Sequence, residues 1–487
     1  MKILITFPPL ESEKGIPLLS QNRQFQWFNN PTFIYPIIPA SAATLLKSKG
    51  YNVIWKDAIA ERKSFSEWID FIELEKPEVI VIETKTPVVK KHWEIINTVK
   101  ERFPYTKIVL MGDHVTALPE ESFKMCNVDF IIAGGNFDFL LLNLVDFLSE
   151  KYKKLDGGIY YREGNTIRNT GNFQRKYNLD DLPFIDRELT KWQLYAYNNG
   201  NYKKTPGTYI MSGRDCWYHQ CTFCSWTTLF PEFSRRSVDN VLDEIGVLID
   251  KYHVKEIMDD TGTFPVGDWL IEFCHGMIKR GYNKKISIDC NMRLGKAINF
   301  ETMKLMKKAN FRLILVGIES ANQKTLDRVS KGEHIEEMID NVKKMKKAGL
   351  FPHITIMFGY PWESEEDAKK TLELGKYLLI KNYAYTMQAT VVIPYPGTPL
   401  FEECKKKGWL LTTDWDRYDM REPVMKVPMK SEILMKYVQG LYSVAFNPEF
   451  LMRKFLSIRD FHDIKYFYKA GLKAIGHILD FRGKNKS

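Results

Sequence analysis

Short β-rich runs alternate with amphipathic segments in the first 150 residues, and this pattern constrains the fold more than any other feature of the chain. Strand-helix alternation of this kind builds a doubly wound, flavodoxin-like parallel sheet, whose ligand site lies beyond the carboxyl ends of the strands. The predicted strands are residues 2–6, 53–55, 79–83, 108–112 and 130–133, and the predicted helices are residues 40–49, 88–102, 119–125 and 137–149.

The next segment changes character. Residues 157–165 predict a small hairpin with its turn at residues 163–165, and the run Leu-Asp-Asp-Leu-Pro at 179–183 marks a linker. After it, strand and helix patterns alternate six more times up to about residue 400. The expected divisions are therefore residues 1–150, 151–205 and 206–400, followed by a helical region at 401–487.

Composition indicates the class of protein. A chain of 487 residues, with 44% apolar and 27% charged residues, is expected to be a soluble globular protein with more than one core. The net charge is +10, but residues 451–487 hold nine Lys or Arg against three Asp, which accounts for +6. A tail with this bias favours an anionic partner or a membrane surface over a nucleic-acid-binding fold.

Targeting signals and disulfides are not expected. The N-terminus has too short an apolar run for a signal peptide. An uncharged run at residues 24–46 reaches spanning length, but its three prolines predict a loop followed by a helix. Seven cysteines without paired spacing argue against a disulfide framework and for a reducing compartment, the cytoplasm.

Three of these cysteines, Cys216, Cys221 and Cys224, fall within nine positions directly after an apolar run. Soft thiolates at this spacing can converge on one soft metal centre. A tetrahedral zinc ion would need a fourth ligand, for which His219 would have to fold back past its own neighbours. An iron–sulfur cluster with one open iron satisfies the count better, while zinc and a chance cluster of buried cysteines remain the alternatives.

This segment resembles the signature of the radical SAM superfamily, Cys-x3-Cys-x2-Cys with an aromatic residue before the last cysteine. Phe223 stands in that place, but the first interval is four residues here, so the loop must bulge by one residue. The resemblance implies that S-adenosylmethionine chelates the open iron of a four-iron four-sulfur cluster. One electron, from a donor such as ferredoxin or flavodoxin, then releases a 5′-deoxyadenosyl radical.

The resemblance also implies a fold and a binding site for residues 206–400. Six βα units fit the superfamily's partial (β/α)6 TIM-type barrel, with its chemistry at the carboxyl ends of the strands. Asp260 is expected to receive the methionine amino group, since the adjacent Asp259 must face the other way. Arg293 could hold the carboxylate as a charge-assisted pair, with a surface ion pair as the alternative.

The later strands of the barrel carry weaker matches. Glu319 and Ser320, in the run Gly-Ile-Glu-Ser, resemble the motif that binds the ribose hydroxyls. Residues 360–363 resemble the stretch that backs the adenine. The proline-rich run at 394–399 is expected to shape the entry of the substrate.

The ends of the first five strands carry small and polar residues, as a cofactor crevice requires. Directly before a radical SAM motif, this layout resembles the cobalamin-binding domain of the cobalamin-dependent class. The run at 112–121 looks like that family's glycine-histidine-proline-threonine loop, with Val115 where proline is common. The cobalamin contacts that the resemblance implies are Thr84, Thr86, Gly112, Asp113, His114, Thr116, Gly134 and Gly135.

Two departures accompany this resemblance. Asp-x-His-x-x-Gly, the motif that supplies a histidine to cobalt, is absent, so cobalamin is expected without a protein histidine on its lower face. Residues 134–137 read Gly-Gly-Asn-Phe, where relatives often carry alternating glycine and glutamate. The second departure affects the residues that would contact the nucleotide tail of cobalamin.

The last helical segment is amphipathic and basic. Its apolar face, which more often packs on its own protein than on a membrane, consists of Ile464, Tyr468, Leu472, Ile475 and Leu479, beside a stripe of Lys465, Lys469 and Lys473. If this face contacts lipid at the membrane periphery, the substrate is expected to be lipid-like. No further cysteine cluster follows the barrel, so an auxiliary iron–sulfur centre is not expected.

Together these patterns predict a cobalamin-dependent radical SAM enzyme that methylates an unactivated carbon of a small-molecule or lipid-like substrate. One alternative keeps the cofactors but ends in cyclisation, rearrangement or oxidation without methyl transfer. The other is a non-catalytic iron–sulfur redox or binding protein.

Overall fold

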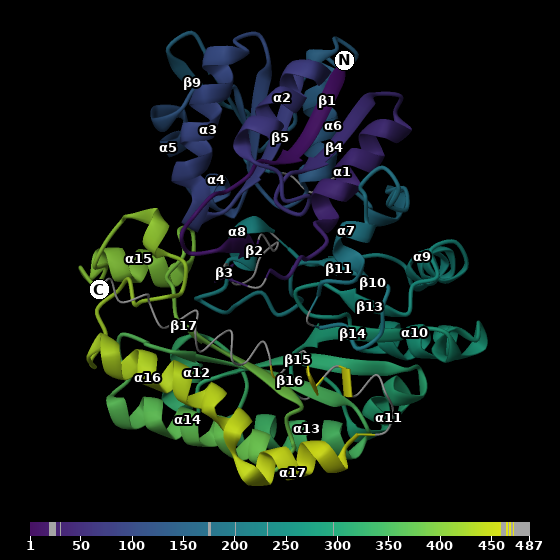
Figure 1. The fold of residues 1–487 in the computed structure, drawn as a ribbon, viewed down its shortest axis with the longest axis vertical. Coiled ribbons are helices and arrows are strands. Elements are labelled where there is room, and N and C mark those ends of the chain that lie inside the picture. The colour runs from purple at the N-terminus through teal and green to yellow at the C-terminus, as the bar shows by residue number, and fades with distance from the viewer. Residues whose placement is uncertain are drawn as a thin grey trace.

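Two α/β domains are stacked on one another in the computed structural model (Figure 1). The model describes residues 1–18, 26–29, 31–173, 177–199, 201–230, 232–295, 297–458, 464–465, 467–468 and 471. In the view of Figure 1, the short hairpin of β2 (Ile16–Leu18) and β3 (Gln26–Phe28) and helix α8 (Trp226–Leu229) lie between the two domains.

The N-terminal domain is built on a seven-stranded sheet. Its order is β4 (Asn52–Asp57), β1 (Lys2–Phe7), β5 (Val79–Thr84), β6 (Lys107–Gly112), β7 (Phe130–Ile132), β8 (Ile159–Glu163) and β9 (Thr166–Asn169). The first five strands are parallel, in the flavodoxin-like order with its switch point beside β1. All six residues of β5 are buried, as expected for a strand covered on both faces.

The predicted hairpin is present and continues this sheet. β8 pairs antiparallel with β7, and β9 pairs antiparallel with β8. The sheet of the N-terminal domain therefore runs past residue 150 and includes residues that the sequence places in the connecting segment.

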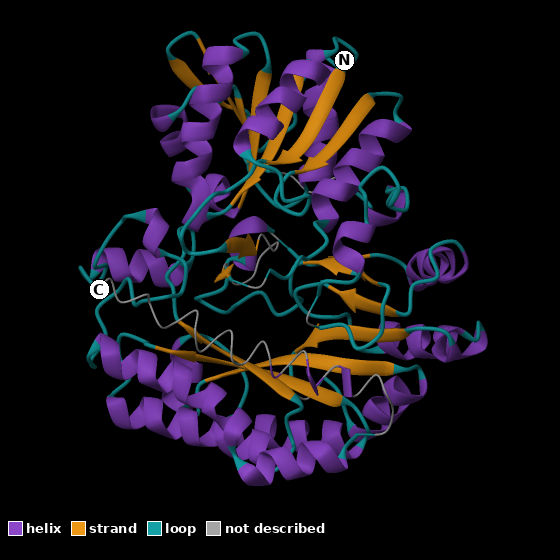
Figure 2. Cartoon of the chain, viewed as in Figure 1, coloured by secondary structure: helices purple, strands orange, loops and turns teal. Residues whose placement is uncertain are grey.

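Helices flank both faces of this sheet (Figure 2). They are α1 (Ile37–Ser48), α2 (Phe65–Glu75), α3 (Val89–Arg102), α4 (Asp113–Ala117), α5 (Pro119–Met125) and α6 (Phe137–Leu148). Helix α2 was not predicted, although Ser64 and Glu67 form a capping box at its start. Helix α1 begins three residues before the predicted residue 40, directly after Pro36. Among the described helices, none combines the length and apolar composition that a membrane span requires.

The connecting segment holds two short helical turns, η2 (Leu179–Asp181) and α7 (Gln193–Ala196). A fully buried guanidinium, Arg187, donates hydrogen bonds to Thr208 Oγ1 at 2.6 Å and to the carbonyl oxygen of Tyr209 at 3.0 Å. Arg187 thereby attaches this segment to the first strand of the second domain.

The second domain is an open barrel of six parallel strands. In sheet order, which is also sequence order, these are β10 (Gly207–Ile210), β13 (Glu256–Asp259), β14 (Ser287–Met292), β15 (Phe311–Glu319), β16 (Phe351–Phe358) and β17 (Thr386–Val391). Helices cover one face: α9 (Val238–Asp250), α10 (Asp268–Lys279), α11 (Phe300–Lys308), α12 (Gln323–Arg328), α13 (Ile335–Lys347) and α14 (Glu365–Ile380). The predicted fold class, a doubly wound sheet followed by a partial (β/α)6 barrel, is confirmed.

A helical region completes the described chain, with α15 (Pro399–Lys406), α16 (Ser431–Tyr442) and α17 (Pro448–Leu456). Residues 409–428 between them are largely irregular, as predicted, apart from the turn η4 (Trp415–Arg417) and one bridge between Leu410 and Met425. Of the predicted amphipathic face, Ile464 and Tyr468 are exposed. Leu472, Ile475, Leu479, Lys469 and Lys473 lie outside the described residues.

Candidate active site

The three clustered cysteines lie on one half-buried loop between the short strand β11 (Gly213–Arg214) and helix α8. The backbone of Asp215 and of His219 is left-handed, with φ of 72° and 51°. Left-handed residues other than glycine are uncommon, and here one directly precedes Cys216 while the other lies within the longer first interval. The backbone of that interval thus contains one left-handed residue, His219.

His219 is paired with Asp215. Its Nδ1 atom contacts an Asp215 carboxylate oxygen, and the Asp215 side chain is fully buried. Burial raises the pKa of Asp215 to about 7 and lowers the pKa of His219. The Nδ1 atom of His219 is therefore engaged by a carboxylate of the residue that precedes Cys216.

The donor set of the loop fits an iron–sulfur cluster. Burial raises the pKa of the Cys224 thiol, and the charges of Cys221 and Cys216 raise it further. Three thiolates are the ligands that such a cluster needs when one iron stays open. Within the described part of the chain, no three His, Cys, Asp or Glu side chains form a group suited to a single metal ion.

The end of β13 packs against this loop. Cys216 Sγ lies 3.0 Å from Thr263 Oγ1, and a side chain on Gly262 would meet the backbone oxygen of Asp215 at 2.8 Å. Asp259 accepts hydrogen bonds from the backbone and the hydroxyl of Ser212, at 2.9 and 2.5 Å. Asp259 thus forms hydrogen bonds inside the barrel, and the adjacent Asp260 is also buried.

Four buried charged groups surround Cys221. Arg293 Nη1 lies 3.9 Å from Cys221 Sγ, and Lys331 Nζ forms a 2.8 Å ion pair with Glu319 Oε1. Glu333 Oε2 completes the group, at 3.7 Å from Arg293 Nη2 and 3.9 Å from Lys331 Nζ. The structure therefore brings together two residues predicted for S-adenosylmethionine, Arg293 and Glu319, with two that the sequence did not suggest.

The bare backbone of Gly317 makes room for one of these ion pairs. A Cβ atom there would lie 1.9 Å from Glu319 Oε1 and 2.8 Å from Lys331 Nζ. Lys331 was missed because it follows helix α12 and not a strand. The signal that could have found it is the dipeptide Lys331-Gly332, in which the glycine adopts a left-handed backbone beside Tyr218.

Ser320 and residues 360–363 form a second part of this edge. The Ser320 hydroxyl donates to Glu363 Oε1 at 2.6 Å and is fully buried. The rings of Tyr360 and Trp362 are stacked with centroids 5.5 Å apart, and Phe223 packs against the same apolar cluster. The aromatic residue before Cys224 thus touches the stretch predicted to back the adenine.

The carboxyl edge of the N-terminal sheet is polar, and its hydroxyls are engaged within the domain. Thr84 Oγ1 lies 2.7 Å from His92 Nδ1, and Thr86 Oγ1 lies 3.2 Å from His114 Nδ1. Thr116 Oγ1 donates to the carbonyl oxygen of Gly112 at 2.6 Å and accepts from the N–H of Gly134 at 3.1 Å. These contacts hold the loops after β5, β6 and β7 in place.

His114 is held on both ring nitrogens. Its Nε2 atom lies 3.1 Å from Glu121 Oε2, its ring is fully buried, and Trp93 and Trp415 lie edge-on at 6.1 and 5.3 Å between centroids. Since Nδ1 faces Thr86, neither nitrogen is directed at open space.

Lys85, between two predicted contact residues, was missed. Its side chain is buried, and among the described residues Nζ has no hydrogen-bond partner. Its nearest carboxylate oxygens are Glu83 Oε1 at 3.6 Å and Asp113 Oδ2 at 3.9 Å. A buried ammonium without hydrogen bonds fits a polar ligand above this edge, such as a corrin ring with its amide side chains. A lysine that directly follows an apolar strand was the available signal.

Loops at the carboxyl ends of strands in the two domains contact each other. After β7, a side chain on Gly135 would meet the ring of Phe230 at 2.1 Å, just beyond the cysteine loop. After β17, one on Gly397 would meet the Cβ atom of Ala117 at 2.9 Å. Arg214, two residues before Cys216, forms a buried ion pair with Asp138 of α6. The cysteine loop thus lies directly beneath the carboxyl edge of the first sheet.

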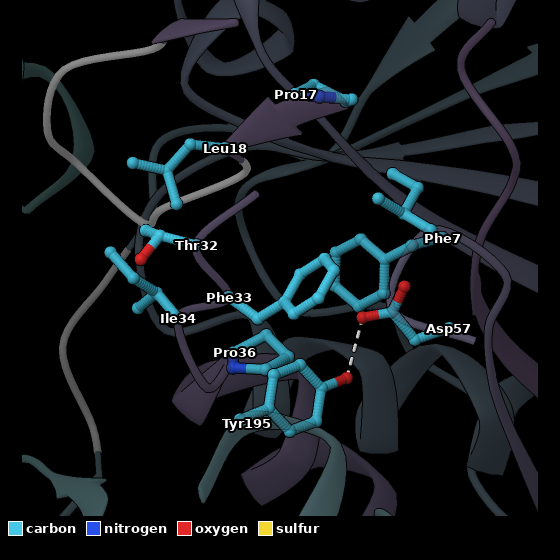
Figure 3. Close-up of a pocket in the computed structure, with 10 residues that line it drawn as sticks. Phe7, Pro17, Leu18, Thr32, Phe33, Ile34, Pro36, Asp57 and Tyr195 are labelled. Carbon is cyan, nitrogen blue, oxygen red and sulfur yellow. Dashed lines mark hydrogen bonds between the residues drawn. The ribbon is translucent and has the colours of Figure 1, made fainter. Parts of the chain in front are cut away.

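A separate pocket, partly open to solvent, lies beside the ends of β1 and β4 (Figure 3). Apolar side chains, including Phe7, Leu18 and Phe33, form most of its wall. Its buried carboxylate is Asp57, which accepts a 2.6 Å hydrogen bond from the hydroxyl of Tyr195. Burial raises the pKa of Asp57 to about 6.

Asp57→Asn should stabilise the protein more at pH 8 than at pH 5, by about 1–1.5 kcal/mol. A pKa of about 6 in the folded state, above the usual aspartate value of 3.8, means that ionisation of Asp57 opposes folding. The free-energy cost of ionising Asp57 grows as the pH rises from 3.8 to about 6 and stays constant above that range. Asparagine does not ionise and carries no such cost. Urea unfolding of both proteins at the two pH values measures the difference. An equal effect of the substitution at both values would contradict this assignment.

Comparison with known proteins places these observations in a family. Residues 210–375 match the model of the Radical SAM superfamily. The chain is 28% identical over 474 residues to an uncharacterised methyltransferase of Pyrococcus horikoshii, covering 93% of this chain and 94% of that one. It is 25% identical over 463 residues to an anaerobic magnesium-protoporphyrin IX monomethyl ester cyclase of Rubrivivax gelatinosus, covering 90% and 79%.

Solved structures share the fold. The cobalamin-dependent S-adenosylmethionine radical enzyme OxsB, solved with aqua-cobalamin and S-adenosylmethionine, aligns with a TM-score of 0.71 at 15% identity, over 99% of this chain and 71% of that one. The radical S-adenosylmethionine methyltransferase TsrM of Kitasatospora setae, solved with cobalamin and a [4Fe-4S] cluster, aligns with a TM-score of 0.63 at 16% identity, over 83% and 78%.

The cysteine loop and the open barrel have the features of a radical SAM enzyme, and residues 210–375, which contain them in large part, match that superfamily. The N-terminal sheet gives the chain the two-domain fold of the cobalamin-dependent radical SAM enzymes. The predicted family and fold class are thereby confirmed. The individual ligand contacts predicted for S-adenosylmethionine and cobalamin stay predictions.

Proposed function

We propose that this enzyme transfers a methyl group from S-adenosylmethionine to an unactivated carbon of a small-molecule or lipid-like substrate. The observation that carries the proposal is the contact between the two functional edges, with Gly135 against Phe230 beside the cysteine loop. Cobalamin held by the first sheet and an iron–sulfur cluster held by the cysteine loop would both lie next to the space in which a substrate reacts. The similarity to a methyltransferase over nearly the whole chain supports the same reaction.

The residues of each edge would hold one set of cofactors. Cys216, Cys221 and Cys224 would hold a four-iron four-sulfur cluster. Contacts to S-adenosylmethionine would come from Phe223, Asp260, Arg293, Glu319 and Ser320. Cobalamin would lie in the domain of residues 1–150 against Thr84, Thr86, Gly112, Asp113, His114, Thr116, Gly134 and Gly135. When bound, these groups supply a radical and a methyl group.

The chain's own residues orient and shield this chemistry. The Glu319 carboxylate, fixed by Lys331, presents an acceptor for ribose hydroxyls. Arg214 and Asp138 keep the N-terminal domain against the cysteine loop, which would limit the access of water to the reacting carbon. Tyr395, in the proline-rich loop after β17, donates a 3.0 Å hydrogen bond to the carbonyl oxygen of Tyr418 and so fixes one wall of the substrate entrance.

The proposal extends to partners and surroundings. A small reducing protein such as ferredoxin or flavodoxin would deliver the electron, and a cluster of this kind requires a reducing compartment such as the cytoplasm. The basic C-terminal segment, with Ile464 and Tyr468 exposed, is the candidate for peripheral membrane contact. A lipid-like substrate would accord with such a contact.

A second candidate function is ring formation without methyl transfer, favoured by the similarity to the magnesium-protoporphyrin IX monomethyl ester cyclase. One experiment separates the two. The protein, reconstituted anaerobically with iron, sulfide and cobalamin and then reduced, is incubated with a metabolite extract and S-adenosylmethionine whose methyl group is deuterated. Methyl transfer yields a product heavier by one labelled methyl group in mass spectrometry. Formation of 5′-deoxyadenosine with an unlabelled product would favour the cyclase-like outcome.

A further inference from the structure

The environment of Cys221 differs from that of the other two clustered cysteines in its charged neighbours. Four side chains around it carry full charges and are at most 9% exposed: Arg293, Lys331, Glu319 and Glu333. Formal charges of the four cancel, two positive against two negative. The electrostatic environment of the Cys221 sulfur therefore depends on which of these four charged groups lie nearest to it.

Of these four groups, Arg293 contacts the Cys221 sulfur, and its guanidinium is held in place by several partners. Its Nη1 atom donates to Cys221 Sγ at 3.9 Å, and Nη2 donates to the carbonyl oxygen of Lys331. The guanidinium also lies 3.6 Å from the ring centroid of Tyr218 and 5.7 Å from that of Trp217. A planar group with partners at its edge and on its face cannot swing away from the sulfur without losing several contacts.

The two acids are engaged by other donors. Glu319 Oε1 accepts from Lys331 Nζ, and Glu333 Oε1 accepts from the N–H of Gly295 at 2.7 Å. The charged group in contact with the Cys221 sulfur is therefore a cation, Arg293.

Positive charge and N–H donors beside a cluster sulfur stabilise the more reduced, more negative state of the cluster. We propose that Arg293 and Lys331 are positioning residues that raise the reduction potential of the cluster through its Cys221 ligand, with Glu333 moderating them. This inference rests on the proposed function, since it requires the cluster. It assigns Arg293 a role toward the sulfur in addition to the predicted role toward the S-adenosylmethionine carboxylate.

The test measures the midpoint potential of the reconstituted cluster, by potentiometric titration followed by electron paramagnetic resonance without S-adenosylmethionine. Arg293→Gln and Lys331→Gln should each lower the midpoint potential, because each removes a positive charge near Cys221. Glu333→Gln should raise it, since the amide can still accept from Gly295 but no longer offsets Arg293. Arg280→Gln, which removes a surface cation paired with Asp239 and Asp243, is the matched control and should leave the potential unchanged.

The predicted shifts in midpoint potential have opposite signs for the cation variants and for Glu333→Gln. This distinguishes an electrostatic role from a structural one, because general loosening of the site would shift all three potentials in the same direction. If Arg293→Gln or Lys331→Gln fails to assemble a cluster, Glu333→Gln decides, and an unchanged or lowered potential in that variant overturns the inference. Unchanged potentials in variants that all hold four-iron clusters also overturn it and leave the proposed function intact. If the unmodified protein forms no four-iron cluster, the proposed function itself fails.

Discussion

Cys221→Ala should abolish the reductive cleavage of S-adenosylmethionine, with 5′-deoxyadenosine falling to the level of a reaction without protein. The reason is coordination: a loop with two cysteines cannot hold three irons of a cluster while leaving the fourth open. The half-buried Cys221 also has Arg293 beside its sulfur, and neither the described loop nor its neighbours offer a nearby cysteine as replacement.

The measurement is made on anaerobically reconstituted protein, by chromatography of the nucleoside product together with iron and sulfide analysis. Cys126→Ala is the matched control, since Cys126 is buried in the N-terminal domain at the end of α5, away from the loop. It should retain both the cluster and the cleavage activity. Cleavage by Cys221→Ala at the level of the unmodified protein, or bound zinc in place of iron in the unmodified protein, would contradict the assignment of this site.

Arg214→Met should lower the free energy of unfolding by about 3–5 kcal/mol, because it leaves a buried carboxylate without its counter-ion. The side chains of Arg214 and Asp138 are 5% and 0% exposed, and Arg214 also donates to Asn136. Among the described residues, Asp138 would keep a hydroxyl donor, Ser41 at 2.8 Å, and the backbone N–H of Phe139. The pair joins the cysteine loop to the N-terminal domain, so its loss should also weaken the contact between the domains.

The unfolding is measured in urea, with tryptophan fluorescence and circular dichroism compared because two domains need not unfold together. Arg102→Met is the control. Its ion pair with Glu73 is about half exposed on both sides, and its loss should cost less than about 1 kcal/mol. The double variant Arg214→Met with Asp138→Leu should recover much of the stability, since no unpaired charge is left inside. Equal costs for Arg214→Met and Arg102→Met would show that burial of the pair is unimportant.

The strands of this protein could be predicted well from the sequence because their signals are local. Val79–Thr84 consists of four apolar residues followed by Glu83 and Thr84, and the structure extends the predicted strand by one residue. Helix α2 was missed because its apolar face is short, although Ser64 and Glu67 form its capping box. The hairpin at β8 and β9 was predicted as a hairpin, but its pairing with β7 depends on residues nearly thirty positions earlier.

The residues of the candidate site also fall into those with a local signal in the sequence and those without one. The three cysteines, and the strand-end residues Glu319 and Arg293, were found because each follows a recognisable run. Lys331 was not found, because its relevance comes from an ion pair with Glu319 that a turn after α12 makes possible. His114 was named as a contact residue, but only the packing of Trp415 against it, some three hundred residues later in the chain, explains why its ring is held.

By itself, the sequence determined the two series of strands and helices, the three-thiolate loop and the polar residues at the strand ends, since each depends on neighbours a few positions away. The tertiary structure alone decided that loops at the two carboxyl edges contact each other, that Arg214 joins them, and that buried cations lie beside Cys221. These features depend on contacts between residues far apart in the chain, whose energy exists only once both domains have formed their cores and come together.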